Sequence, residues 1–391
     1  MALEKYEKNN YIDSNKIYMM NINKLKILSD SAQYDLCNYV TPSVENIKNG
    51  EIPGVYNATS PNGCFIPLFK VLMTNKCNND CKYCANHSKR KFSRLEYSPE
   101  ELSDIFLNYY YQNMVDGLFL SSGVSKDIDN TMEKMIEVTR LLRVDHGYKG
   151  YIHLKILPGS SYDMIKRAMS LSDRVSINIE AATPDGFQEL TSTKDYQKDI
   201  LKRMKWIKRI SNKNPEFSPS GQTTQFIIGA NNESDEEILK RVKWLSNNFG
   251  MKRSYYSPFQ PLKETPLENL DKPEPMRAPR LYQADYLINY YGFNLNELIF
   301  DGEGNLSVDE DPKYLMALNN PEKFPVEINS ASFKELITVP GIGKISALRI
   351  LHEKRKGHVF NKLEELKKLG AVIKRAEPFV KFKGVYQATL D

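Results

Sequence analysis

Three of the five cysteines in this 391-residue chain, Cys77, Cys81 and Cys84, lie within eight residues of one another. They follow an apolar, strand-like run at residues 65–73, so we expect all three thiols on one loop at the end of a strand. Such a loop can ligate three irons of a four-iron four-sulfur cluster and leave the fourth iron open. An amine and a carboxylate can chelate that open iron. The cluster can then pass an electron to a bound sulfonium and release a carbon radical.

Zinc is the alternative metal for this loop, because His87 follows Cys84 by three residues and completes a Cys3His set. Structural zinc sites usually draw ligands from two separate segments, whereas these four residues come from one short stretch, which favours the cluster. We read His87 as an ordinary loop residue, and Cys37 and Cys64 as buried apolar side chains. The odd cysteine count and the clustering argue against a disulfide framework.

β-rich runs alternate with helical patterns across residues 65–258, which predicts repeated strand-helix units around a parallel sheet. The expected strands are 65–73, 117–121, 150–157, 174–180, 223–229 and 251–257, and the clearest helices are 100–115, 131–143, 194–210 and 234–249. Six units close only part of a barrel. We therefore predict an α/β fold with a partial, TIM-like (β/α)6 barrel whose open side admits a large substrate.

Three parts are expected along the chain: an N-terminal extension at 1–61 that packs on the barrel, the barrel at 62–323, and a small all-α domain with a tail at 324–391. The extension has helical periodicity at 23–34, and we assign it no chemistry. Neither a signal peptide nor an apolar run of membrane-spanning length is evident, which indicates a cytoplasmic protein without a membrane partner.

Positive charge is concentrated at the C-terminal end. Residues 325–391 hold thirteen Lys and Arg against seven Asp and Glu, a net charge of +6, whereas the whole chain carries +5. The first 324 residues therefore carry −1. A basic end on a near-neutral body favours a polyanionic partner, and nucleic acid before membrane.

Polar and apolar residues alternate along 174–180, so Ser176, Asn178 and Glu180 share one face of the fourth strand. In a barrel that face points inward. An inward carboxylate is costly without a partner, and the ribose hydroxyls of a nucleoside cofactor would provide one. A structural salt bridge is the alternative for Glu180.

The Cys-x3-Cys-x2-Cys spacing, with an aromatic residue at Tyr83, resembles the signature of the radical SAM superfamily. The resemblance implies two cofactors, a [4Fe-4S] cluster and S-adenosylmethionine (SAM), and an electron donor such as flavodoxin or ferredoxin. It also implies that Tyr83 belongs to the cofactor site and that the tip of the second strand, Ser121-Ser122-Gly123, approaches the methionine amine. The usual pair of glycines and glutamate is absent from this tip. At the end of the fifth strand, Gly229 would flank the adenine.

The C-terminal stretch Val339-Pro-Gly341-Ile-Gly343-Lys344 lies between helical patterns at 330–337 and 345–355, and it resembles a helix-hairpin-helix motif. Gly341 and Gly343 permit the tight turn, and free amides at the start of the next helix receive a phosphate. Lys344 and Arg349 add positive charge beside it. The alternative is a hairpin used for protein contacts.

The combination, from residues 24–35 through 280–287 to the hairpin, resembles a family named for DNA modification or repair by radical SAM proteins. The resemblance implies a nucleic-acid substrate, with DNA as the first candidate. It also implies a uracil-DNA glycosylase-like protein as a further partner, but it does not define a reaction. We expect a 5′-deoxyadenosyl radical to abstract hydrogen from a nucleotide that is flipped out of a duplex. Two other classes stay open: a radical SAM enzyme acting on tRNA, a peptide or a metabolite, and a zinc-stabilised DNA-binding protein without catalysis.

Overall fold

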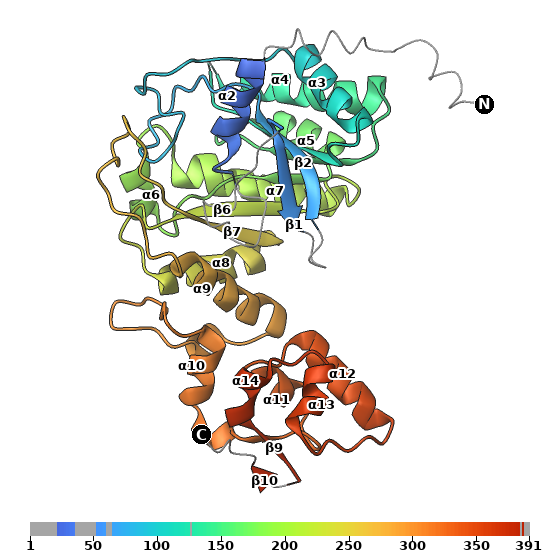
Figure 1. Cartoon of the computed structure of the whole chain (residues 1–391). Coiled ribbons are helices and arrows are strands. Elements are labelled where there is room, and N and C mark those ends of the chain that lie inside the picture. Colours follow the sequence, from blue (N-terminus) through green and yellow to red (C-terminus); the bar gives the residue numbers. More distant parts are fainter. Residues whose placement is uncertain (1–21, 36–51, 60–64, 126, 384, 387–391) are drawn as a thin grey trace, which may run out of the picture. The chain divides into compact units, whose positions relative to one another are not determined.

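The computed structural model describes residues 22–35, 52–59, 65–125, 127–383 and 385–386. Within these residues, seven strands form one curled sheet in the order β1 to β7 (Figure 1). β1 runs antiparallel to β2, and β2 to β7 are parallel. The strands are β1 (Val55–Thr59), β2 (Phe65–Leu72), β3 (Gly117–Ser121), β4 (Tyr151–Lys155), β5 (Arg174–Ser176), β6 (Gln222–Ile228) and β7 (Arg253–Pro258).

The predicted α/β partial barrel is confirmed, because the six parallel strands fall on the six predicted runs. Two features differ from the expectation. β1, within the N-terminal extension, adds an antiparallel strand at the edge beside β2. The fourth predicted strand pairs regularly only over Arg174–Ser176, and beyond it Glu180, with a positive φ of 65°, keeps a single bridge to Phe226 of β6.

Helices lie between the parallel strands, and α3, α4, α5 and α7 pack against one another in that order. Their bounds are α3 (Pro99–Tyr111), α4 (Ile128–Arg140), α5 (Tyr162–Leu171), α6 (Pro184–Leu190) and α7 (Lys202–Lys213), with π turns η2 (Leu141–Asp145) and η3 (Tyr196–Leu201). α2 (Ile22–Ala32) packs on β2, as expected for the extension. Ser98 caps α3 through a capping box with Glu101, which fixes where the loop after β2 ends and the helix begins.

The strands separate a polar face from an apolar one. Ser121, Lys155 and Gln225 line a pocket inside the barrel, whereas their neighbours Leu120, Leu154 and Phe226 are buried apolar residues. This alternation follows from the two-residue period of a strand. The barrel interior is therefore equipped with groups that bind polar ligands.

Contacts divide the chain into two units, residues 1–232 with 247–272 and residues 233–246 with 273–391. The second unit contains α8 (Asp235–Phe249) up to residue 246, α9 (Arg277–Tyr286), η4 (Leu287–Tyr291), η5 (Leu295–Glu297), α10 (Pro312–Leu318), η6 (Pro321–Lys323), α11 (Phe333–Thr338), α12 (Lys344–Arg355), α13 (Leu363–Lys368), α14 (Ile373–Ala376) and η7 (Glu377–Phe379). Its C-terminal part is not purely helical. A small sheet, β10-β9-β8, is formed by β8 (Val326–Glu327), β9 (Val380–Phe382) and β10 (Val385–Tyr386).

No helix in the described part of the chain combines the length and the apolar character needed to cross a membrane.

Candidate cofactor site and hairpin

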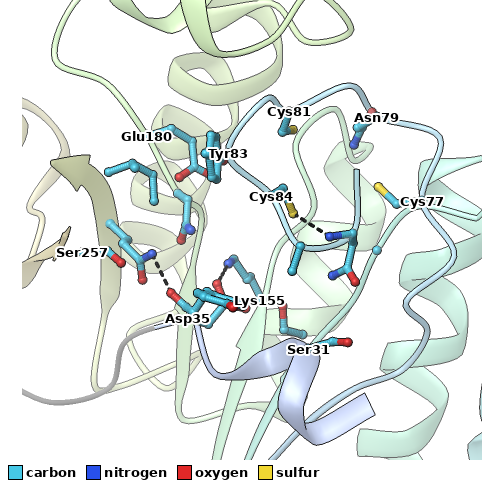
Figure 2. Close-up of a pocket in the computed structure, with 18 of the residues that line it drawn as sticks. Ser31, Asp35, Cys77, Asn79, Cys81, Tyr83, Cys84, Lys155, Glu180 and Ser257 are labelled. Atoms are coloured by element: carbon cyan, nitrogen blue, oxygen red, sulfur yellow. Dashed lines mark hydrogen bonds and ion pairs between the residues drawn. The ribbon is translucent and has the colours of Figure 1, made fainter. Parts of the chain in front are cut away.

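The three cysteines lie on the loop between β2 and α3, and all three line one pocket of the first unit (Figure 2). Asp80, within the loop, accepts hydrogen bonds from the Thr191 and Thr193 hydroxyls at 2.7 and 2.8 Å and from the Ser192 amide at 3.1 Å. Burial raises the pKa of Asp80, but these hydrogen bonds outweigh it and hold the pKa well below its usual value. The loop is thus tied to the segment that follows α6.

Gly123 holds the other side of the loop. Its amide donates to the Thr74 carbonyl at 2.7 Å, and the Asn78 amide donates to the Val124 carbonyl at 2.8 Å. A Cβ at residue 123 would lie 2.5 Å from the Lys76 carbonyl oxygen and 3.2 Å from the Cys77 Cβ. The tip of β3 can therefore pass this close to the cysteine loop only with glycine at position 123.

The thiols lie where an uncompensated thiolate is costly. Cys81 is buried and Cys77 and Cys84 are half-buried. Burial raises the pKa of Cys81 and of Cys84, and in Cys84 the neighbouring thiols raise it further. Positive charge beside the sulfurs, such as bound iron, is what would stabilise the thiolates here.

Glu180 carries the clearest requirement for a ligand. Its backbone has a φ of 65°, a left-handed conformation that is uncommon outside glycine, and its amide donates a hydrogen bond to the Gln225 carbonyl at 2.9 Å. Its Oε2 atom is buried and has no hydrogen-bond partner among the described residues. Burial raises the pKa of Glu180, while the nearby Lys194 ammonium opposes that rise. A bound group with hydroxyl donors would satisfy this oxygen.

Lys194 is a cation that the sequence analysis did not identify. Burial lowers its pKa, but the neighbouring Cys81 and Glu180 outweigh this and raise the pKa above its usual value. Lys194 therefore stays charged between the cluster loop and the carboxylate. Its position in an irregular stretch after α6 gives no periodic signal that could have identified it.

Most of the residues predicted for the cofactor lie together. Tyr83, Ser121, Ser122, Gly123, Asn178 and Glu180 line the same pocket as the three cysteines. Gly229 does not line it; with a φ of 82° it forms the turn after β6. The role of each residue toward SAM stays a prediction.

The residues present fit a [4Fe-4S] cluster and SAM. One loop offers three thiols to one cavity, which matches three ligated irons and one open iron. The same cavity contains a buried carboxylate oxygen, Oε2 of Glu180, for which the described part of the chain offers no hydrogen-bond partner. His87 does not line the cavity, and its Nδ1 accepts a hydrogen bond from the Lys89 amide at 3.1 Å. Cys37 and Cys64 lie outside the described residues.

The hairpin forms between α11 and α12 as expected. Gly341 has a φ of 82°, and its carbonyl accepts from the Val372 amide at 2.9 Å. A Cβ at residue 341 would lie 2.3 Å from the Val372 carbonyl oxygen, so this glycine is required for close packing. Gly343 is the N-cap residue of α12 and, as a glycine, has no side chain that could cap the helix.

The amide that the motif would present to a phosphate is engaged in this structure. The Lys344 amide donates to the Tyr291 hydroxyl at 3.0 Å, and the Lys313 ammonium donates to the Ile342 carbonyl at 2.6 Å. The side chains of Lys344 and Arg349 are exposed. A phosphate that binds the Lys344 amide would therefore replace the Tyr291 hydroxyl.

A half-barrel sheet with three cysteines on the loop after its first parallel strand defines the class of the protein. The model of the radical SAM superfamily matches residues 71–245, and the model of the helix-hairpin-helix motif matches residues 322–375. The chain thus contains a radical SAM domain and a helix-hairpin-helix motif. The matched superfamily consists of enzymes that bind a [4Fe-4S] cluster and SAM, and the three thiols of this chain fit that cluster.

Biotin synthase of Clostridioides difficile (strain 630) is 28% identical to the chain over 206 residues, which are 52% of this chain and 59% of that enzyme. The chain thus matches less than two thirds of the relative's length. Among solved structures, methylornithine synthase (PylB) aligns with a TM-score of 0.44 at 14% identity, over 56% of this chain and 60% of that one. The hydrogenase maturase HydG from Carboxydothermus hydrogenoformans aligns with a TM-score of 0.45 at 14% identity, over 76% and 74%. The assignment rests on the family model and on the site, not on these scores.

Proposed function

We propose that the chain is a radical SAM enzyme that modifies or repairs a nucleic acid, with DNA as the first candidate. The observation that carries the chemistry is a pocket that joins three cysteine thiols to a buried carboxylate oxygen, which has no hydrogen-bond partner among the described residues. The observation that supports the substrate is the match of residues 322–375 to a helix-hairpin-helix motif in the basic part of the chain.

Five side chains of the pocket have assigned roles in this proposal. A bound, reduced cluster with SAM would supply one-electron chemistry, in which cleavage of the sulfonium releases methionine and provides a carbon radical for hydrogen abstraction from the substrate. Three irons would be ligated by Cys77, Cys81 and Cys84. The Glu180 carboxylate would accept hydrogen bonds from the ribose hydroxyls of SAM. Lys194 offsets negative charge between the loop and Glu180.

An anaerobic experiment tests the chemistry. The reconstituted protein should contain about four irons per chain and form 5′-deoxyadenosine from SAM after reduction. The Cys77→Ala/Cys81→Ala/Cys84→Ala variant should lose both. A colourless protein with one zinc after reconstitution would contradict the proposal.

A second measurement tests the substrate class. Single-stranded and duplex DNA, tRNA and a mixed peptide pool are each added to the reduced enzyme, and the rate of 5′-deoxyadenosine formation is compared. Stimulation by DNA alone supports the proposal. Stimulation by tRNA alone would indicate that the substrate is RNA. Stimulation by peptides alone would contradict a nucleic-acid substrate.

A second function of the hairpin is favoured by one contact. Because the Lys344 amide already donates to the Tyr291 hydroxyl, the hairpin is equally suited to a docking role in which this turn packs on protein. Tyr291→Phe separates the two, since it frees the amide without removing the ring. A higher affinity for DNA in this variant indicates a phosphate site, and unchanged affinity indicates docking.

A further inference from the structure

A buried ion pair lies in the cofactor pocket at a point that the cluster chemistry does not use. The Lys155 ammonium, at the end of β4, pairs with the Asp35 carboxylate, which follows α2 (Figure 2). The two side chains are only 13% and 16% exposed. Burial raises the pKa of Asp35, but the Lys155 ammonium outweighs it and the net shift is downward, so the carboxylate stays charged.

The pair lines the pocket of the cofactor residues. Asp35 and Lys155 line the same cavity as Cys77, Cys84 and Glu180, so a group held by the pair shares that cavity with the cofactor. Asp35 also lines a second, much smaller hollow, to which Phe119, Thr223 and Tyr255 contribute. This hollow carries a further unsatisfied group, because the Thr223 hydroxyl is fully buried and has no hydrogen-bond partner among the described residues.

An ion pair of this kind adds little net stability, because desolvation of both charges offsets most of their attraction. The pair does place a hydrogen-bond acceptor, the Asp35 carboxylate, directly beside a hydrogen-bond donor, the Lys155 ammonium, in the lining of the pocket. The Watson–Crick edge of every nucleobase has the complementary arrangement, a donor beside an acceptor, and enzymes that act on extruded bases read that edge by hydrogen bonds.

We propose that Asp35 and Lys155 are a recognition pair for the Watson–Crick edge of a single unpaired nucleobase, held in the cavity that also takes the cofactor. The inference rests on the proposed nucleic-acid substrate and adds where its base binds. It also gives the N-terminal extension a role, since Asp35 is brought into the barrel by α2, which packs on β2.

The test is equilibrium binding of thymidine, deoxycytidine and deoxyguanosine to the SAM-saturated, unreduced protein under anaerobic conditions. These nucleosides lack phosphate, so the hairpin cannot hold them through its phosphate site. The principal variant is Asp35→Leu/Lys155→Met, which removes both charges together and leaves neither buried alone. The matched control is Glu133→Leu/Arg167→Met, which removes an exposed ion pair of the same unit.

At least one nucleoside should bind the unsubstituted protein, and its affinity should fall at least tenfold in Asp35→Leu/Lys155→Met and remain within twofold in the control. Iron content and SAM affinity, measured on the same samples, should change by less than about threefold. Failure of all three nucleosides to bind would overturn the inference. Equal affinity in the principal variant would do the same, and an equal fall in SAM affinity would assign the pair to the cofactor.

The outcome for the proposed function is read separately. If DNA stimulates 5′-deoxyadenosine formation but no nucleoside binds, the nucleic-acid substrate stands and the pair is wrong. If a nucleoside binds through the pair but no nucleic acid stimulates turnover, the base site stands and the macromolecular substrate falls.

Discussion

Two residues, Gly123 and Glu180, determine the local geometry of the cofactor pocket. Gly123 lets β3 pass against the cysteine loop, and Glu180, bridged to β6 in a left-handed conformation, lines the pocket. The first feature is steric and the second is conformational. Each therefore has its own test.

Gly123→Ala should weaken both the fold and the cluster. The new Cβ would meet the Lys76 carbonyl oxygen at 2.5 Å, so the loop or the strand tip must shift. Overpacking of this kind costs ~1–3 kcal/mol. We expect a lower free energy of unfolding in urea and less iron per chain after reconstitution. Gly302→Ala is the control, because a Cβ there has no neighbour within 4 Å; equal losses in both variants would contradict the steric argument.

Glu180→Gln should weaken SAM binding and leave the cluster intact. Hydrogen bonds to a charged acceptor contribute ~1.5–3 kcal/mol, so the dissociation constant for SAM should rise roughly tenfold or more. Equilibrium dialysis with the reconstituted protein measures it. Glu189→Gln removes an exposed carboxylate from α6 and should have no effect. An unchanged SAM affinity in Glu180→Gln would mean that Glu180 does not bind SAM and instead forms a structural salt bridge.

At the scale of elements, the sequence predicted the parallel strands well because alternation and β-branched runs mark them locally. It did not predict β1, whose five residues become a strand only by pairing with β2. Nor did it predict that regular pairing of the fourth strand ends at Ser176 or that Glu180 has a positive φ, since no local pattern in the sequence signals either feature. The cysteine spacing identified the loop, whereas Lys155 and Asp35 meet only through the fold, 120 residues apart.

The first turn of α10 contains a lysine, Lys313, whose charge depends on burial. Burial lowers the pKa of Lys313 to about 7, compared with ~10.4 for an unfolded lysine. Between these values the unfolded chain binds more protons than the folded one, so the free energy of unfolding should increase as pH rises from about 7 toward 10.

The size of this increase should be ~2–4 kcal/mol for the second unit. Urea denaturation at several pH values measures it, with Lys313→Met as the variant that should lose the increase. Lys334→Met removes an exposed lysine of the same unit and should keep it. A pH dependence that is the same in Lys313→Met and in the unsubstituted protein would show that Lys313 titrates normally.

At the scale of the whole molecule, charge and chemistry are in different parts of the chain. The pocket with the cysteines belongs to the first unit, whereas the net charge of +6 belongs to residues 325–391. The sequence predicted this separation because it depends on composition alone. It could not predict that the Lys344 amide is engaged by Tyr291, since that contact joins segments 53 residues apart.

If the hairpin binds a nucleic-acid backbone, its affinity must depend on salt. Each phosphate neutralised on duplex DNA contributes a slope of about −0.9 to log K against log salt. Lys344→Gln/Arg349→Gln removes two exposed charges beside the hairpin, so the slope should become shallower by about 2 and the affinity at low salt should fall. Fluorescence anisotropy with one duplex over a range of KCl concentrations measures both. Lys166→Gln/Lys205→Gln removes two exposed charges from the first unit and should leave the slope unchanged. The same slope in the hairpin variant would mean that DNA does not contact this face, and an equal change in both variants would mean that binding follows net charge rather than the hairpin.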